Sequence, residues 1–369
     1  MKTKFIFLII VLLSALDGFS QQKPKEVSPQ TMQRIYDEVK TPYKYGLVLV
    51  PESDSQKIDC PTVFRRGHSW YMTYLRFDGR GYETWLAKSI DLLHWKKLGR
   101  VRSHSVDTTD WDASQKAGYA ALIDTKWGGS YSLKKYNGRY WMSHFGGKEN
   151  GYEAGLLSLG MAYTDKDPTT VHEWRRLSHP ILTSLDKDVR WWENKKQFKS
   201  TVIYDEKKTS GYPFVMYYNA NGDTARDNKK TRWFERIGMA VSDDMVHWKR
   251  FQNGPVVQHP VGITGDPVIQ KIGDVWVMFY FGAFWQDRKG TFNRFACSYD
   301  LVTWTDWNGN NLIESSELYD EKYAHKSFVV KHNGTVYHFY CAVNNKDQRG
   351  IAVATSKDLG KSTINFISE

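Results

Sequence analysis

A short pattern of apolar and polar positions recurs five times along the chain. Each copy has a hydrophobic run followed by a second segment. This second segment contains a Ser or Thr, then a nearby Asp and, in four copies, a Trp at its end. The hydrophobic runs occupy residues 70–74, 140–144, 214–218, 275–280 and 336–340, and the segments after them occupy 86–95, 160–174, 238–248, 295–304 and 351–359. A Gly-containing hairpin signal precedes each of the runs. Four-stranded antiparallel units repeated about an axis form propeller blades, so the pattern predicts an all-β chain folded as a five-bladed β-propeller.

One polar residue of each copy falls at a matching place in the predicted first strand when the copies are aligned on their turns. These residues are Asp59, Ser130, Lys199, Asp266 and His325. The innermost strands of a propeller converge on its axis. We therefore expect these five side chains to face one another at one mouth of the central channel.

The beginning of the chain differs from the repeated part. Residues 1–20 have a basic start and an apolar run too short to span a bilayer, which predicts a signal peptide cleaved near residue 20 and a secreted or periplasmic protein. Residues 21–45 form an extension with a short helix over 28–41, where Ser28 is the N-cap and Pro29 the first helical residue. Residues 46–369 form the propeller catalytic domain, in which 46–50 is a strand that completes the fifth blade. No later stretch is apolar enough for a membrane span.

Composition narrows the function classes. Three cysteines, Cys60, Cys297 and Cys341, are too few for a disulfide framework. The 15 Trp and 22 Tyr are typical of β-rich proteins that stack aromatic rings on sugars. A net charge of +10 favours anionic partners, which for an exported protein are sulfated or uronate sugars rather than nucleic acid. We expect a monomer or dimer.

A resemblance to a known group rests on the repeated phrase and on the first-blade motif. That motif is Ile58-Asp59-Cys60-Pro61, followed by Gly67 and Tyr71. It resembles the five-bladed propeller glycosidases, which include glycoside hydrolase family 43 and its relative family 117. The resemblance covers nearly the whole mature chain and implies glycosidase activity. The family 117 pattern, with an early aspartate, a late aspartate and then a histidine, is similar to Asp59, Asp266 and His325.

This resemblance implies roles for the residues at the channel mouth. Asp59 would be the base, and Asp266 would raise the pKa of His325 so that the protonated imidazole acts as the acid. Glu193 is the alternative acid; its other interpretation is a solvated loop residue. His325 has a second interpretation as a metal or water ligand, with a structural calcium ion in the central channel. No cofactor is required for the reaction.

Further residues are candidates for substrate binding. Lys199, in a dry channel, needs an anionic partner, either Asp266 or a substrate carboxylate or sulfate. The other candidates are Ser130, Arg65, Trp127, Trp191, Trp192 and Trp285. The sequence thus predicts an exo-acting glycoside hydrolase for oligosaccharides from an acidic polysaccharide. Two alternatives stay open: a lyase or dehydratase on the same fold, and a non-catalytic carbohydrate-binding propeller.

Overall fold

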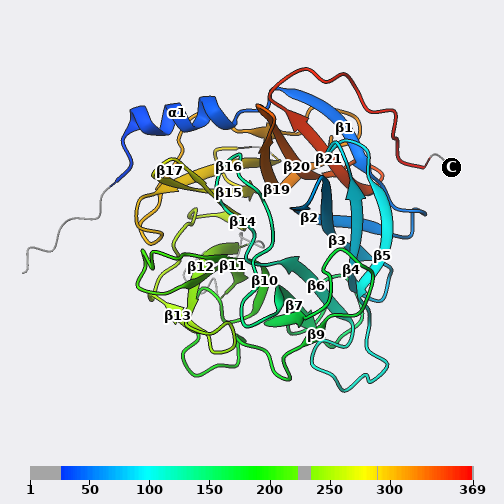
Figure 1. Cartoon of the computed structure of the whole chain (residues 1–369), viewed down its shortest axis with the longest axis vertical. Helices are drawn as coiled ribbons and strands as arrows, with labels where there is room; N and C mark the ends of the chain where they lie inside the picture. The colour runs from blue at the N-terminus through cyan, green and yellow to red at the C-terminus, as the bar shows by residue number, and fades with distance from the viewer. Residues whose placement is uncertain (1–25, 223–233, 289, 368–369) are drawn as a thin grey trace, which may run out of the picture.

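The computed structural model describes residues 26–222, 234–288 and 290–367. The predicted signal peptide lies outside these residues. The described chain has one α-helix, α1 (Pro29–Val39), and is otherwise built from strands in several sheets, which confirms the all-β class. Figure 1 shows the sheets arranged around a common centre, with β2, β6, β10, β14 and β19 nearest to it.

The strands fall into four hydrogen-bonded sheets. The first sheet contains β2 (Lys57–Arg66), β3 (Ser69–Phe77), β4 (Tyr82–Ser89) and β5 (Lys96–Arg102). The second contains β6 (Gln115–Ala120), β7 (Tyr140–Gly147), β8 (Ser158–Thr164) and β9 (Arg175–Arg176). The third contains β10 (Lys196–Tyr204), β11 (Phe214–Asn221), β12 (Phe234–Ser242), β13 (Lys249–Phe251), β14 (Gly262–Ile272), β15 (Val275–Ala283), β16 (Thr291–Ser298), β17 (Thr305–Asp306) and β18 (Ile313–Glu314). The fourth contains β1 (Tyr43–Leu49), β19 (Tyr323–His332), β20 (Thr335–Val343) and β21 (Arg349–Thr355).

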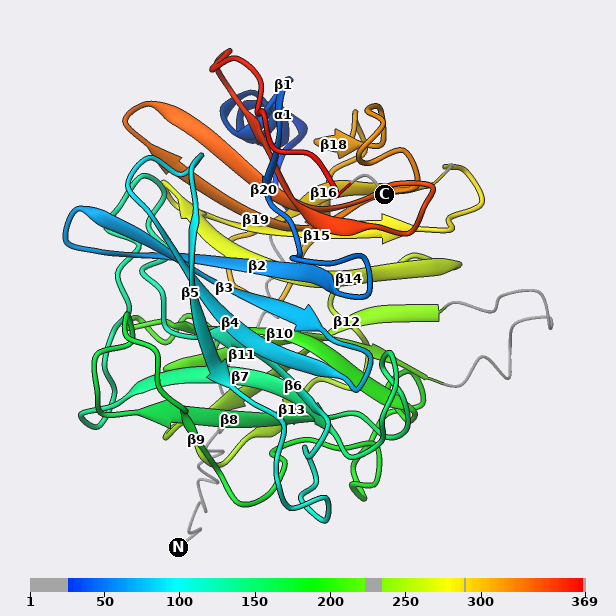
Figure 2. The same cartoon turned by 90° about the vertical axis from the view of Figure 1, so that its right-hand side faces the viewer.

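The fourth sheet joins the two ends of the described chain. Strand β1 pairs antiparallel with β21, so the strand expected near residues 46–50 does complete the last sheet. Helix α1 begins as predicted: the Ser28 side chain accepts a hydrogen bond from the Thr31 N–H, and Pro29 follows directly. Its residues Met32 and Ile35 are buried against the core. The Tyr36 ring stacks on Trp307, directly after β17, and Figure 2 shows α1 at the opposite end of the molecule from β8 and β9.

The repeated Ser-x-Asp segments form turns between strands. The Ser89 hydroxyl accepts from the backbone N–H of Asp91, and the Asp91 carboxylate accepts from the N–H groups two and three residues later. Asp300 does the same in the fourth copy. In the third copy Asp244 has this role, because it lies two residues after the serine. These turns are local backbone caps, which is why the sequence shows them so regularly.

The first strand of four units is interrupted near the centre of the molecule. The pairing register shifts directly after Asp59, Gln197, Gly265 and His325. In three of these bulges the next residue has a left-handed φ: Cys60 (47°), Asp266 (56°) and Lys326 (63°). Bulges re-aim side chains and are common beside functional sites. When the strands are aligned on these register shifts, Asp266 falls at the same position as Lys326, and His325 at the same position as Asp59.

The expected alignment is wrong for Ser130. The first strand of the second unit, β6, ends at Ala120, so Ser130 lies in the connection to β7. Its exposed hydroxyl donates to Asp124 at 2.6 Å.

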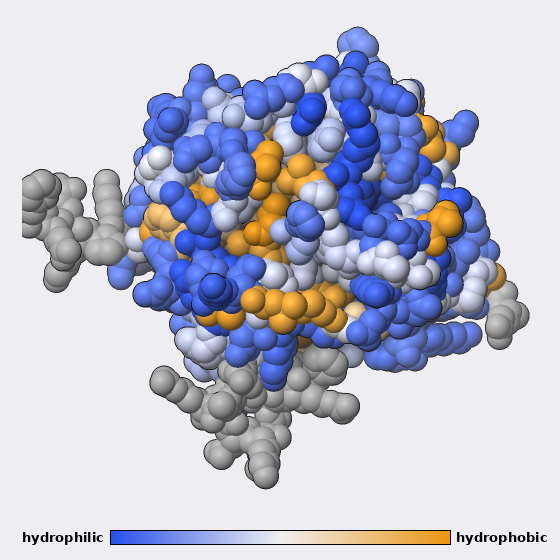
Figure 3. All heavy atoms as spheres, turned by 90° about the horizontal axis from the view of Figure 1, so that it is seen from below, coloured by the Kyte–Doolittle hydropathy of each residue, from blue (hydrophilic) through white to orange (hydrophobic). Residues whose placement is uncertain are grey.

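The outer surface is largely hydrophilic. On the side seen in Figure 3, hydrophilic residues surround a limited group of apolar ones. The three cysteines are buried and unpaired, in line with the absence of a predicted disulfide framework. Within the described residues, no helix has the length and apolarity needed to cross a membrane.

Candidate active site

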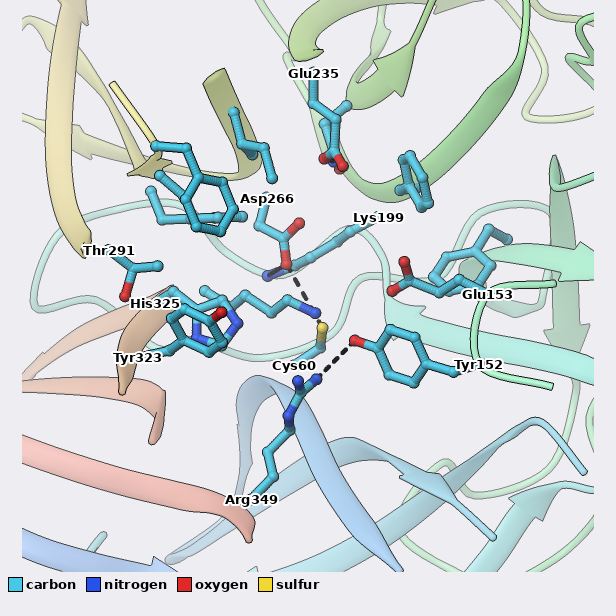
Figure 4. Close-up of a pocket in the computed structure, with 18 of the residues that line it drawn as sticks. Cys60, Tyr152, Glu153, Lys199, Glu235, Asp266, Thr291, Tyr323, His325 and Arg349 are labelled. Atoms are coloured by element: carbon cyan, nitrogen blue, oxygen red, sulfur yellow. Dashed lines mark hydrogen bonds and ion pairs between the residues drawn. The ribbon is translucent and has the colours of Figure 1, made fainter. Parts of the chain in front are cut away.

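A pocket of about 190 Å³ opens where the bulged first strands meet. Its walls come from several sheets, so no single unit could form it. The polar side chains that line it are Cys60, Tyr119, Tyr152, Glu153, Lys199, Asn219, Glu235, Asp266, Thr291, Tyr323, His325, Lys326 and Arg349. Figure 4 shows Glu153 and Glu235 on one side of this pocket and Tyr323 and His325 on the other.

Asp59 lies beneath the pocket and is completely buried. One carboxylate oxygen accepts from Lys326 Nζ at 2.9 Å and from Arg349 at 2.7 Å. The other accepts from the Cys60 N–H at 2.9 Å. Burial alone would raise the pKa of Asp59, but the two cations hold it well below its usual value. Asp59 is therefore a permanently ionised anchor for two basic side chains.

Those basic side chains connect the anchor to the pocket wall. Arg349 also donates to the Tyr152 hydroxyl at 2.7 Å, and Figure 4 marks this contact. Tyr152 precedes Glu153 in the connection between β7 and β8. The buried ion cluster thus extends to the loop that carries Glu153.

Glu235 is the second residue of β12 and accepts a hydrogen bond from the Asn219 side-chain amide at 2.7 Å. Burial, and then the negative charges of Glu153 and Asp266, raise the pKa of Glu235 to about 8. This carboxyl group is mostly protonated at neutral pH.

Glu153 is the second carboxyl group of the pair. Burial raises its pKa as well, but Lys326 and Arg349 oppose the rise. Its φ of 50° is unusual for a residue with a side chain, and such strained backbone often occurs at functional sites. Glu153 and Glu235 thus share a pocket but differ in their surroundings: other carboxylates raise the pKa of Glu235 further, whereas two cations oppose the rise at Glu153.

His325 lines the pocket, yet its electrostatics are opposite to the expectation. Its Nδ1 lies 3.2 Å from the Cys341 carbonyl oxygen, which fits a neutral ring that donates there. Burial, and then the positive charge of Lys326, lower the pKa of His325 to about 3. The expectation that Asp266 raises this pKa is wrong, because the charge with the largest effect on the ring is the Lys326 ammonium.

Lys199 and Asp266 lie next to each other at the pocket, which is one of the two partnerships expected for the lysine. Their charged atoms are 4.0 Å apart, and the Lys199 ammonium, 2% exposed, has no hydrogen-bond partner among the described residues. Asp266 also accepts from the Cys60 thiol at 3.5 Å. A buried donor without a partner is free to bind a substrate oxygen.

Glu193 lies away from the pocket and is fully buried, so the interpretation as a solvated loop residue is wrong. Its carboxylate accepts from Arg250 at 2.7 Å and from the Tyr218 hydroxyl at 2.6 Å. Both contacts hold the third sheet together. A side chain engaged in this way does not reach a substrate in the pocket.

The tryptophans expected to stack on sugars also lie elsewhere. The indole N–H groups of Trp127, Trp192 and Trp285 donate to Glu38, to the Asn253 carbonyl and to the Ile263 carbonyl, respectively. Trp191 is 52% exposed and contacts Phe234, next to Glu235. Trp191 is therefore a tryptophan that contacts the start of β12.

Sequence reasoning missed several residues at the pocket. They are Tyr152, Glu153, Glu235, Lys326 and its companion Arg349 on the last strand. The available signal was the lysine beside His325, and a glutamate three residues before the repeated phrase at 238. Neither glutamate occupies a position shared by the five copies.

The lining offers little for a metal ion. Lys199, Lys326 and Arg349 place positive charge where the expected calcium ion would sit. In the described chain, the group of side chains with suitable ligand spacing is Asp78, Glu83 and His104, which lies outside the pocket. Glu83 there is already paired with Arg76 and Arg100.

Comparison with known proteins gives several similarities. No family model matches the chain. A beta-1,2-mannobiose phosphorylase from Thermoanaerobacter sp. (strain X514) is 30% identical over 148 residues, 37% of this chain and 45% of that enzyme. The match therefore spans less than half of that relative.

Two solved structures match almost throughout. A complex of BT0996 with RGII is 54% identical with a TM-score of 0.89, covering 93% of this protein and 99% of that one. A structure described as a glycoside hydrolase is 53% identical with a TM-score of 0.88, with the same coverage. A thermostable family-43 glycoside hydrolase, 15% identical with a TM-score of 0.54 over 85% of this protein and 95% of its own length, has a similar fold.

Proposed function

Since the chain belongs to the glycoside hydrolases, as its sequence resemblance predicted, we propose that its central pocket removes a terminal sugar from an oligosaccharide. Glu235 is the general acid in this proposal, and Glu153 is the opposing carboxylate. The observation that carries it is the pKa of about 8 for Glu235, in a pocket shared with a second carboxyl group. Glycoside hydrolysis needs this pairing of one protonated and one ionised carboxyl group.

The acid must be protonated before it reaches the leaving oxygen. A pKa near 8 keeps Glu235 mostly protonated at pH 7 while leaving it acidic enough to transfer its proton in the transition state. Glu153, whose pKa is raised by burial while Lys326 and Arg349 oppose the rise, is the carboxylate of the pair in this proposal. It either attacks the anomeric carbon or deprotonates the attacking water, and the two routes differ in the anomeric configuration of the first product.

Asp59 has a positioning role in this proposal, in place of the expected base. Its carboxylate is buried, fully hydrogen-bonded and low in pKa, so it has little tendency to take a proton. It fixes Lys326 and Arg349, which in turn set the charge around Glu153.

The pocket favours a neutral terminal sugar. With Glu235 protonated, the positive charges belong to Lys199, Lys326 and Arg349. The negative charges belong to Asp59, Glu153 and Asp266. The two sets balance, so an anionic sugar would add an uncompensated charge to a poorly solvated site. Acidic groups of the substrate would then lie outside the pocket, where the net charge of +10 attracts them.

Exo action is supported by size. About 190 Å³ is less than the roughly 300–1,000 Å³ typical of sites for larger ligands, which suits one sugar at a chain end. The RGII complex of the similar structure suggests an oligosaccharide of that kind as substrate. We place the enzyme outside the cytoplasm, on the basis of residues 1–20 of the sequence.

We also propose that the sheets are five blades of a propeller. The nine-stranded sheet would then contain two blades, β10–β13 and β14–β18. Within the described residues, two residue pairs, Phe234 with Gly262 and Glu235 with Ile263, join them through β12 and β14. These two pairs are parallel, whereas the pairs within each half are antiparallel.

The test is to incubate the purified protein with RGII-derived oligosaccharides and to follow products by mass and ultraviolet absorbance. The proposal expects release of one terminal sugar with addition of one water, and loss of release in Glu235→Gln and Glu153→Gln. Glu206→Gln, a change at an exposed loop, is the matched control. Unsaturated products would instead indicate a lyase. Binding without turnover in all four proteins would indicate a carbohydrate-binding module.

A further inference from the structure

A second cavity of about 490 Å³ lies at the other end of strand β2 from the pocket. It is formed by the β2–β3 turn, the connection between β6 and β7, and the start of β7. The polar residues that line it are Arg65, Arg66, His68, Ser130, Ser132 and Tyr140. Six residues separate Asp59 from Arg65 along the strand, which is roughly 20 Å. We call this cavity the distal groove.

Arg65 is the unusual residue of the distal groove. Its guanidinium lies 5.4 Å from the Trp70 ring, and its buried Nε–H has no hydrogen-bond partner among the described residues. It forms no ion pair with any carboxylate in the described ranges, whereas neighbouring Arg66 is paired with Asp167 at 3.2 Å. A partly buried guanidinium with free donors is a ready site for a planar oxyanion.

The surroundings of Arg65 leave its charge unbalanced. The nearby carboxylate of Asp124 is occupied by hydrogen bonds from Ser130 and from the Lys126 N–H. Burial, and then the positive charge of Arg65, lower the pKa of His332. The groove therefore combines a free cation with hydroxyl groups from Ser132 and Tyr140 along its wall.

We infer that the distal groove is a second carbohydrate-binding site, which takes the carboxylate of a uronate residue on Arg65. The serine and tyrosine hydroxyls meet the ring hydroxyls of the same sugar. This site is separate from the reaction proposed for the central pocket and does not depend on it. The central pocket takes a neutral chain end, and the distal groove holds the acidic part of a polymer on the enzyme surface.

Calorimetric titration with trigalacturonate tests this assignment, with its methyl ester as the uncharged match. Wild-type protein is expected to bind the acid and not the ester. Arg65→Gln should weaken binding at least tenfold. Arg65→Lys should weaken it less, because lysine keeps the positive charge but cannot donate the two parallel hydrogen bonds of a guanidinium. Lys207→Gln, which removes an exposed positive charge elsewhere, should bind like wild type.

A second variant protects the test from a folding defect. Ser132→Glu leaves Arg65 and its Trp70 contact intact but places a carboxylate in the groove, so it should lose binding with an unchanged melting temperature. Release of the terminal sugar from a short oligosaccharide should be unchanged in both groove variants, which separates this site from the central pocket. Equal binding of acid and ester, wild-type affinity in folded Arg65→Gln, or no binding of the acid by wild type would each overturn the assignment.

Discussion

Replacing Glu235 with Gln should make the protein more stable, and the gain should grow with pH. In the folded protein the pKa of Glu235 is about 8, whereas an unperturbed glutamate has 4.5. A group whose folded-state pKa is raised contributes stability that is fully present below pH 4.5 and is lost as the pH rises through about 8. The wild type loses this stability because the unfolded chain can ionise Glu235 freely, and the amide variant does not.

The size of the effect follows from the shift. At 1.36 kcal/mol per pKa unit, raising the pH from 5 to 9 costs the wild type at most about 4 kcal/mol relative to Glu235→Gln. Solvent in the open pocket reduces this to roughly 2–4 kcal/mol. For a chain of this size that corresponds to a difference in melting temperature of roughly 4–8 °C.

The assay is thermal unfolding of both proteins at pH 5, 7 and 9, with Glu206→Gln as the control for loss of an exposed carboxylate. The gap between Glu235→Gln and wild type should widen at each step, and the gap for Glu206→Gln should stay near zero. A constant gap across the three pH values would refute the raised pKa, and with it the assignment of Glu235 as the acid.

Three further outcomes follow from the same contacts. Glu153→Gln should lower kcat by about 10³-fold or more. It should also move the alkaline limb of any residual pH–rate profile to lower pH, because the Glu153 charge helps to raise the pKa of Glu235. An alkaline limb that does not move would argue against electrostatic coupling of the two groups. Asp59→Asn should reduce the free energy of unfolding by about 3–5 kcal/mol in urea titrations, because Lys326 and Arg349 lose their shared anion, and a change below about 1 kcal/mol would contradict the buried cluster. Lys199→Met should raise KM more than tenfold without lowering the melting temperature, because in the described residues the ammonium has no hydrogen bond that the substitution would remove. An unchanged KM would exclude Lys199 from substrate binding.

Much of the architecture could be predicted because its signals are local. The Ser89–Asp91 turn and its counterparts depend on residues two or three positions apart, so they are visible in the sequence. The N-cap at Ser28 is equally local. The pairing of β1 with β21 could be predicted only because the last repeat lacked one strand.

The site was harder to predict because it depends on bulges. A bulge adds one residue to a strand and changes which side chain faces the centre, and spacing between repeats does not reveal where it falls. Aligning Asp266 with His325 therefore put the wrong partners together. The structure aligns Asp266 with Lys326, and that lysine lowers the pKa of His325 instead of raising it.

The contrast between Asp59 and Glu235 explains why the acid that we propose is not at one of the repeated positions. Asp59 has two cations and a backbone N–H, so its charge is stabilised and its proton affinity is small. Glu235 has one amide donor and two carboxylates near it, so its charge is destabilised and it holds a proton at neutral pH. A carboxylate at a repeated position whose hydrogen bonds and ion pairs are all satisfied holds the units together. Proton transfer requires a carboxyl group whose charged form is less well stabilised. We therefore expect the reactive carboxyl groups on connections and strand starts that differ between repeats, and the two that we propose, Glu153 and Glu235, lie at such positions.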